Sequence, residues 1–212
     1  MLLDIHTHQL PSSASSAILS CSMWNMPLPA ETVFLSAGIH PWNVSEADYK
    51  KQLEWVRAMA ATDTRTIAIG EAGLDKLCQT PFELQLKVFR EIIPIAEQYR
   101  LPLILHAVKS TNELIALKKE FAPYSAWIIH GFRGKKELAQ SLVRQGFYLS
   151  FGTRYNREAL QGTPIDRILI ETDEDTQPIY NLYQEAASLL HTTEEEFKDR
   201  VQATINYLFF NR

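Results

Sequence analysis

The feature that most restricts the fold is a series of short apolar runs that alternate with longer amphipathic stretches. Eight runs have the composition of strands, and their near-continuous apolar character is typical of parallel strands covered on both faces. These runs are residues 2–8, 17–21, 33–39, 66–71, 102–107, 126–131, 147–152 and 167–172. Because strands that alternate with helical segments form repeated βα units, the pattern predicts an α/β fold, a TIM (β/α)₈ barrel.

Between and after these runs lie two kinds of segment. Four connections and the stretch that follows the last run carry apolar residues at helical spacing with charged residues opposite, namely 46–61, 82–99, 110–121, 134–145 and 194–209. The first two connections contain PSSASS (11–16) and MWNMPLPAE (23–31), which have the Ser and Pro content of loops. We therefore expect a barrel whose first helices are reduced.

Length and charge limit the organisation further. With 212 residues, of which 46% are hydrophobic, the chain is near the lower end of the length of such a barrel, so residues 1–212 are expected to form a single domain. A net charge of −4 gives no global positive field that would attract polyanions. The chain has only two cysteines, which predicts a cytoplasmic protein. No apolar run has the length of a membrane span, so we expect no membrane partner.

The strongest chemical signal is DIHTH, residues 4–8. Residues two apart on a strand point to the same side, so His6 and His8 converge at one strand end. Two imidazoles in that position can bind one metal ion. A pair of structural polar residues at a strand terminus is the competing interpretation, and the candidates on other strands weigh against it.

Four further candidates follow other strands. Glu71 follows the apolar strand TIAI, His106 ends PLILH, His130 ends AWIIH, and Asp173 follows RILIET. In a closed barrel the eighth strand is next to the first, so Asp173 can share the metal ion of the first histidine pair. The βα loops at the carboxyl ends of barrel strands hold the active sites of such folds. The sequence therefore predicts a site with one or two divalent cations.

The choice of metal stays open. Mixed imidazole and carboxylate ligands suit Zn²⁺, Mn²⁺ or Fe²⁺, whereas Mg²⁺ sites usually contain fewer histidines. We keep Zn²⁺, Mn²⁺ and Mg²⁺ as candidates.

The ordered motifs resemble the TatD family of metal-dependent hydrolases, barrel enzymes related to the amidohydrolases and described as deoxyribonucleases or phosphoesterases. The resemblance follows nearly the whole chain through DIHTH, GIHPW (38–42), IGEAGLD (69–75), LILHAVKS (103–110), IIHGFRG (128–134), YLSFG (148–152) and LIETD (169–173). It implies that His6, His8 and Asp173 bind one metal ion and that His106 and His130 bind a second.

The resemblance also implies other roles. Glu71 would bridge the two ions, and His40 would line the substrate site, although a polar residue that caps a loop turn is an equal interpretation. After the histidine that matches His106 the family usually has a small residue and then an arginine, whereas in this chain Ala107 and Val108 precede Lys109. Lys109 and Arg133 could clamp a phosphate, or could be solvated loop charges.

Two departures affect the pocket. Glu174 and Asp175 stand where the family often has a small residue and a proline, and their charge would discourage a polyphosphate substrate. The short segment 9–32 is expected to open one side of the pocket.

The predicted reaction is hydrolysis by water that divalent cations activate, with Asp173 and Glu71 as catalytic carboxylates and Asp173 as proton acceptor. The substrate would be a small phosphoester or a nucleic-acid end. Alternatives are an amidohydrolase acting on a C–N bond, a phosphatase of the polymerase-and-histidinol-phosphatase type, and a non-catalytic metal-binding barrel. Residue 71 is not the lysine that many amidohydrolases carboxylate, and the two cysteines adjoin none of the site residues.

Overall fold

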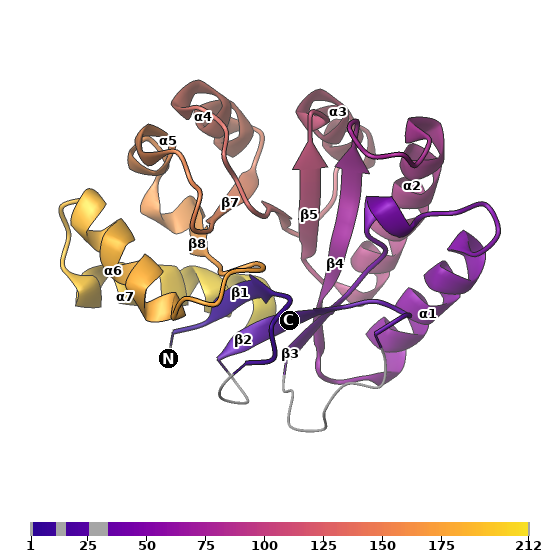
Figure 1. Cartoon of the computed structure of the whole chain (residues 1–212), viewed down its shortest axis with the longest axis horizontal. Coiled ribbons are helices and arrows are strands. Elements are labelled where there is room, and N and C mark those ends of the chain that lie inside the picture. Colours follow the sequence, from indigo (N-terminus) through magenta and orange to yellow (C-terminus); the bar gives the residue numbers. More distant parts are fainter. Residues whose placement is uncertain (1, 12–15, 26–33, 212) are drawn as a thin grey trace.

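Eight parallel strands follow one another around the sheet in chain order. The computed structural model describes residues 2–11, 16–25 and 34–211 (Figure 1). The strands are β1 (Asp4–Thr7), β2 (Ala17–Cys21), β3 (Phe34–Ala37), β4 (Thr66–Asp75), β5 (Leu103–Val108), β6 (Trp127–Ile129), β7 (Phe147–Phe151) and β8 (Ile168–Ile170). Each strand pairs in parallel with the next, from β1 to β8. The predicted α/β barrel class is confirmed.

The barrel closes between β1 and the chain just beyond β8. Thr7 and Asp173 form an isolated parallel bridge. The backbone N–H of His8 donates to the carbonyl oxygen of Asp173 over 3.0 Å, and the N–H of Asp173 donates to the carbonyl oxygen of His6 over 3.0 Å. These bonds pair the first strand with the last, as the barrel requires.

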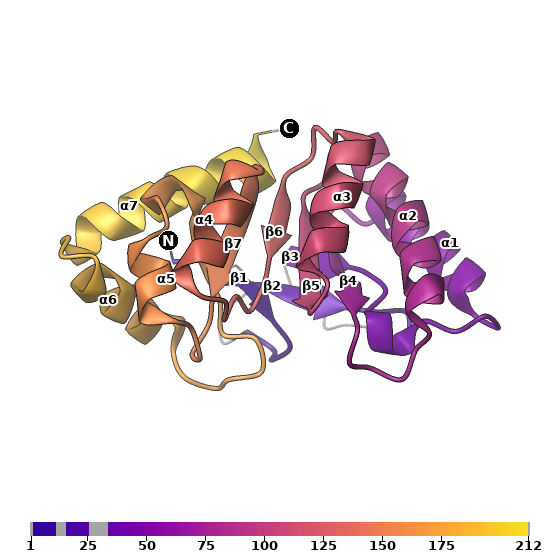
Figure 2. The same ribbon diagram turned by 90° about the horizontal axis from the view of Figure 1, so that it is seen from above.

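Helices surround this sheet on its outside. They are η1 (Pro41–Asn43), α1 (Tyr49–Thr62), α2 (Phe82–Tyr99), α3 (Thr111–Phe121), α4 (Lys136–Arg144), α5 (Arg157–Gln161), η2 (Ile165–Arg167), α6 (Ile179–Leu189), α7 (Glu194–Ile205) and the π-helical turn η3 (Asn206–Phe210). In both views α1, α2 and α3 lie on one side of the strands and α4, α5, α6 and α7 on the other (Figures 1 and 2). No helix of the described residues is long and apolar enough to cross a membrane.

The described residues contain no helix between β1 and β2 or between β2 and β3, but the reduction of the first helices stays a prediction. Most of PSSASS and of MWNMPLPAE, and therefore much of the segment 9–32, lies outside the described residues.

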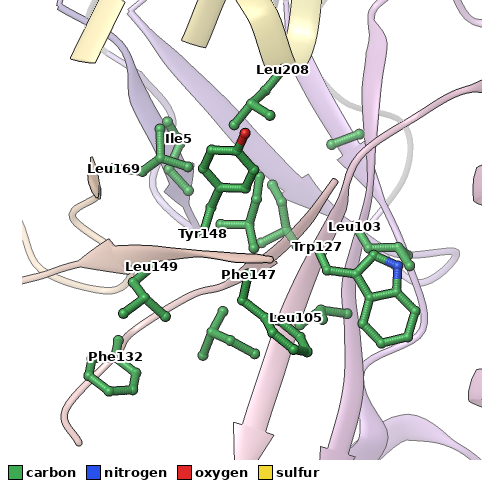
Figure 3. Packing of buried hydrophobic residues seen from close by; sticks show 14 of the residues in the cluster. Ile5, Leu103, Leu105, Trp127, Phe132, Phe147, Tyr148, Leu149, Leu169 and Leu208 are labelled. Carbon is green, nitrogen blue, oxygen red and sulfur yellow. The ribbon is translucent and has the colours of Figure 1, made fainter. Parts of the chain in front are cut away.

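The core follows from the composition of the strands, because all of them are buried along their whole length except the first residue of β3 and the last three residues of β5. Side chains of several strands and of the closing segment gather in one cluster, which includes Trp127 of β6, Phe147 of β7 and Leu208 of η3 (Figure 3). The rings of Trp127 and Phe147 meet edge to face at 5.9 Å between centroids. This packing fixes the strands whose carboxyl ends carry the polar residues.

Two irregularities in the sheet lie next to predicted site residues. The register of β4 against β5 shifts between Ile69 and Ala72, and that of β1 against β2 shifts between Asp4 and Thr7. A bulge re-aims the side chains of its strand, and bulges are common beside active sites. Glu71 and His6 therefore occupy the re-aimed stretches of β4 and β1.

Glycines allow the strands around Glu71 to approach closely. A Cβ atom at Gly38 would lie 2.4 Å from the carbonyl oxygen of Glu71, and one at Gly73 would lie 2.2 Å from that of His106. Since Gly73 also has a φ of +141°, a side chain there would be strained as well as blocked. Only glycine at these two positions permits the observed spacing of β3, β4 and β5.

Candidate metal centre

Five histidines and two carboxylates converge at the carboxyl ends of the strands. The residues are His6 on β1, His8 directly after it, His40 between β3 and η1, Glu71 on β4, His106 on β5, His130 after β6 and Asp173 after β8. All except the buried His6 line a pocket of about 790 Å³. The sixth histidine, His191, lies apart from them and is exposed in the turn that follows α6. The structure thus brings the six predicted metal ligands and His40 together.

Glu71 stands between two groups of side chains. Its Oε2 lies 3.5 Å from His6 Nε2 and 3.4 Å from His8 Nε2. Both of these nitrogens also face Asp173 Oδ1, at 3.8 and 3.7 Å. The other oxygen, Oε1, lies 2.7 Å from His106 Nδ1 and 2.6 Å from His130 Nε2. The two groups of ligands that the family resemblance implies thus face different oxygens of Glu71, and their binding of two ions bridged by this carboxylate stays a prediction.

The charges of this cluster depend on one another. Burial opposes ionisation of Glu71, but the positive charge of His130 and hydrogen bonds from His106, His130 and His40 hold its pKa well below the usual value. Burial disfavours the charged form of His130, yet the carboxylates of Glu71 and Glu171 raise its pKa well above the usual value. Hydrogen bonding to Glu71 raises the pKa of His8. The site therefore favours positive charge beside an ionised Glu71.

Two buried carboxylates that the sequence argument did not assign support these histidines. Asp75 Oδ2 lies 3.2 Å from His106 Nε2, and Glu171 Oε1 lies 3.3 Å from His130 Nδ1. Glu171 Oε1 also accepts from the backbone N–H of Gly131 over 2.6 Å. A histidine that binds a metal ion usually donates its other ring N–H to a carboxylate, which fixes the tautomer. His106 Nδ1 and His130 Nε2 are left facing Glu71.

Both carboxylates stand in motifs already quoted, Asp75 in IGEAGLD and Glu171 in LIETD. The signal that could have identified them is that each histidine ligand needs a partner for its second nitrogen. A sequence without coordinates does not say which carboxylate meets which ring. Their position next to the site was predictable, but not their pairing.

His40 has both of the roles considered for it, because it caps a turn and also lines the pocket. Its Nδ1 accepts a hydrogen bond from the backbone N–H of Trp42 over 3.2 Å, so it caps the 3₁₀ turn η1. Its Nε2 lies 3.2 Å from Glu71 Oε1 and 3.2 Å from His106 Nδ1. Distance alone groups His40, Glu71 and His106 as possible ligands of one ion. Because Nδ1 is an acceptor, the neutral ring carries its proton on Nε2, which favours donation to Glu71 over metal binding.

Asp4 fixes the first strand beneath the site. Its Oδ1 accepts from the backbone N–H groups of His6 and Thr172, at 3.2 and 3.0 Å, and its Oδ2 accepts from the Thr172 hydroxyl over 2.5 Å. Burial raises the pKa of Asp4 to about 7, although the hydrogen bonds from Thr172 act in the opposite direction. Asp4 therefore ties β1 to the segment that carries Asp173.

The residues present fit divalent cations. His6 is completely buried, and neither of its ring nitrogens has a hydrogen-bond partner among the described residues. A buried polar atom without a partner is unfavourable unless a missing ligand satisfies it. Two ligands about 2 Å from one ion lie roughly 3 to 3.5 Å apart at tetrahedral or octahedral angles, and the distances from His6 and His8 to Glu71 Oε2 are in that range.

Three cations line the same pocket. They are Lys109 after β5, Arg133 after β6 and Arg154 after β7. Within the described residues no ion pair or hydrogen bond engages these side chains, and all three residues are exposed. Lys109 has a φ of +53°, a left-handed conformation that is uncommon outside glycine. Free cations above an ionised cluster suit an anionic substrate.

Comparisons with known proteins identify the family of this chain. The model of the family described as "TatD related DNase" matches residues 15–205. The chain belongs to this family. The metal-dependent hydrolase YabD of Bacillus subtilis is 33% identical over 66% of this chain and 58% of its own length. The deoxyribonuclease Tat-D of Schizosaccharomyces pombe is 27% identical over 70% of this chain and 53% of its own length. The TatD chain thus spans little more than half the length of these relatives.

Solved structures share the fold of this TatD chain. The crystal structure of YjjV, a TatD homologue from Escherichia coli, superposes with a TM-score of 0.80, covers 98% of this chain and 97% of its own, and is 20% identical. At that identity the likeness establishes the barrel architecture alone. The family resemblance drawn from the motifs is confirmed by the family model.

Proposed function

We propose that this TatD protein is a metal-dependent hydrolase that cleaves phosphoester bonds at the ends of single-stranded nucleic acid. The observation that carries the proposal is Glu71, whose two carboxylate oxygens face different groups of histidines on the floor of the pocket. His6, His8 and Asp173 would hold one cation, and His106 and His130 a second. A cation in such a site lowers the pKa of bound water and stabilises developing negative charge.

The chain's own residues would then perform the remaining steps. Asp173 is about one quarter exposed on the pocket wall, so its carboxylate can accept the proton of the attacking water. Lys109 and Arg133 would bind the non-bridging oxygens of the phosphate, for which the guanidinium fork is well shaped. Asp75 and Glu171 would keep the imidazoles of His106 and His130 in the required tautomers.

Phosphoesters are favoured over other substrates by the free cations. A C–N bond in a neutral amide would give Lys109, Arg133 and Arg154 no anionic group to bind, whereas a phosphodiester carries negative charge beside the scissile bond. The S. pombe relative is named a deoxyribonuclease, which supports a nucleic-acid substrate.

Chain ends and single strands are favoured because the chain carries a net charge of −4. A protein that grips duplex DNA along its length needs a broad basic surface. Three cationic side chains line the pocket, which suits a strand end that enters it.

Purified protein loaded with Mn²⁺ tests this proposal on three substrates: a single-stranded DNA oligonucleotide, a phosphomonoester and a cyclic amide. We expect cleavage of the oligonucleotide from its ends, loss of activity with EDTA, and restoration by added Mn²⁺. Turnover of the amide alone would replace the proposal with an amidohydrolase. Absence of turnover on all three would favour a non-catalytic metal-binding barrel. The single-domain organisation of residues 1–212 and the cytoplasmic location stay predictions.

A further inference from the structure

Trp42 lies at the edge of the pocket and is exposed, yet its ring is held in place. The side chain is 63% exposed and lines the pocket. Its Nε1 donates to Asp75 Oδ2 over 2.7 Å. The indole meets the ring of His40 edge to face, with centroids 4.8 Å apart, and that of His106 at 5.9 Å. The ring is therefore fixed by three neighbours while much of its surface faces solvent.

This arrangement prepares the ring for stacking. The only polar atom of the indole is satisfied inside the protein, so a planar apolar group can cover the ring without burying an unpaired N–H. Because the side chain is already ordered, a ligand that stacks on it loses little additional conformational entropy. Trp24 is similarly exposed, at 58%, but does not line the pocket.

The surroundings identify the kind of planar group. Trp42 enters the pocket from the connection between β3 and β4, whereas Arg133 and Arg154 follow β6 and β7, across the barrel. Glu71, His106 and His130 come from β4, β5 and the end of β6, which lie between these two sides in the strand order. A nucleotide has an anionic phosphate at one end and a flat base at the other, and these ends match the cationic side and the Trp42 side.

We propose that Trp42 is the stacking platform for the nucleobase adjacent to the phosphodiester bond that is cleaved. The inference rests on the proposed function, since it assigns a base-binding residue to that same site. Stacking on an aromatic ring accepts every base, so the enzyme would discriminate nucleotides from other phosphoesters without reading sequence. Trp42 would thus determine substrate class.

A different role for Trp42 is that it only positions Asp75, and through it His106. Two variants separate these roles. Trp42→Phe keeps an aromatic ring but loses the N–H that donates to Asp75, whereas Trp42→Leu loses both. Trp24→Leu is the matched control, because it removes an exposed tryptophan outside the pocket lining.

The test compares single-stranded DNA in which a nucleotide next to the scissile bond either carries its base or is abasic. For the wild type and for Trp24→Leu we expect kcat/KM to be about tenfold higher on the base-bearing strand. The ratio of kcat/KM on the base-bearing strand to kcat/KM on the abasic strand should fall to near one in Trp42→Leu. In Trp42→Phe most of the preference for the base-bearing strand should remain. A ratio in Trp42→Leu equal to that of the wild type would overturn the proposal.

Binding without catalysis provides a second readout. In EDTA, the dinucleotide pTpT should quench the tryptophan fluorescence of the wild type and of Trp24→Leu, but not that of Trp42→Leu. Equal cleavage of both strands by the wild type, or quenching that survives in Trp42→Leu, would contradict stacking while leaving the hydrolase intact. Failure of the wild type to cleave either strand would instead refute the proposed function, and the stacking role with it.

Discussion

The backbone N–H of Asp173 donates to the carbonyl oxygen of His6 over 3.0 Å, so the last candidate ligand of the chain is paired with the first. The same bond contributes to closing the barrel between β1 and the segment after β8. Assembly of the site and closure of the barrel are therefore coupled at this point. Asp173 has a φ of +59°, a left-handed conformation that Asp and Asn tolerate better than most residues.

Replacement of Asp173 by Asn should remove activity without unfolding the protein. An amide keeps the left-handed backbone but neither accepts the proton nor binds a cation as well, so we expect kcat to fall by about 10²- to 10⁴-fold. The unfolding free energy should stay close to that of the wild type. Asp173→Ala should lose activity as well, and its free energy of unfolding should fall by about 1 kcal/mol because alanine tolerates this φ poorly. Denaturant titration and kinetics measure both effects, with His191→Asn as a control that should be silent.

Asp75 is predicted to act on metal binding through His106. Its carboxylate lies 3.2 Å from His106 Nε2 and would orient the ring. Since loss of such a supporting carboxylate typically weakens metal binding by about 10- to 100-fold, Asp75→Asn should raise the dissociation constant for Mn²⁺ by that factor. Isothermal titration measures it. Asp63 lies outside the pocket lining, so Asp63→Asn should leave the dissociation constant for Mn²⁺ unchanged. If both variants raised this constant equally, a specific role for Asp75 would be excluded.

Asp63 should instead affect stability, and in a pH-dependent way. Its side chain accepts from Arg65 Nε and Nη2, at 2.9 and 2.7 Å, and this hydrogen bonding lowers the pKa of Asp63 below the unfolded value of 3.8. The stabilisation is present above pH 3.8 and is lost as the pH falls through the lower folded pKa. Because the pair is near the surface, Asp63→Asn should cost less than about 1 kcal/mol at pH 7. The difference should shrink in urea titrations below pH 4, and a constant difference would contradict the pairing.

Salt should weaken nucleic-acid binding only slightly. Three cationic side chains line the pocket, and each phosphate contact to a single strand contributes about −0.7 to the slope of log affinity against log salt concentration. For single-stranded DNA we therefore expect a slope of roughly −2. Arg154→Ala should reduce the slope by about 0.7. Arg167, which packs over the ring of Tyr148, does not line the pocket, and Arg167→Ala should not change it. A much steeper slope with internal cutting of duplex DNA would show that a wider basic face takes part.

Much of the fold could be predicted from the sequence because apolar runs and helical spacing are local signals. The helices α5 and α6 were not predicted. α5 has five residues, too few for a clear period, and begins where Asn156 Oδ1 accepts from the N–H of Ala159 over 2.9 Å. The closing helix was expected to continue to residue 209, but α7 ends at Ile205 and changes to the π-helical turn η3. Such helix ends depend on tertiary packing, which a local sequence pattern does not predict.

The candidate site was predictable where a residue lies just beyond the carboxyl end of a strand, as with His130 and Asp173. The two roles of His40 were not separable, because the choice of cap or site residue depends on which atom each ring nitrogen meets. Arg154 was missed for a similar reason, since nothing local distinguishes it from a solvated loop charge. Its position in the pocket results from the way the barrel brings β7 beside β6.

The proposed function depends most directly on where divalent cations bind. A crystal soaked in Mn²⁺ and measured near the manganese absorption edge would locate them by anomalous scattering. We predict one peak between His6, His8 and Asp173 and another between His106 and His130, with Glu71 contacting both. Anomalous peaks elsewhere on the protein, with these side chains pointing apart, would contradict the assignment of a metal centre to this pocket.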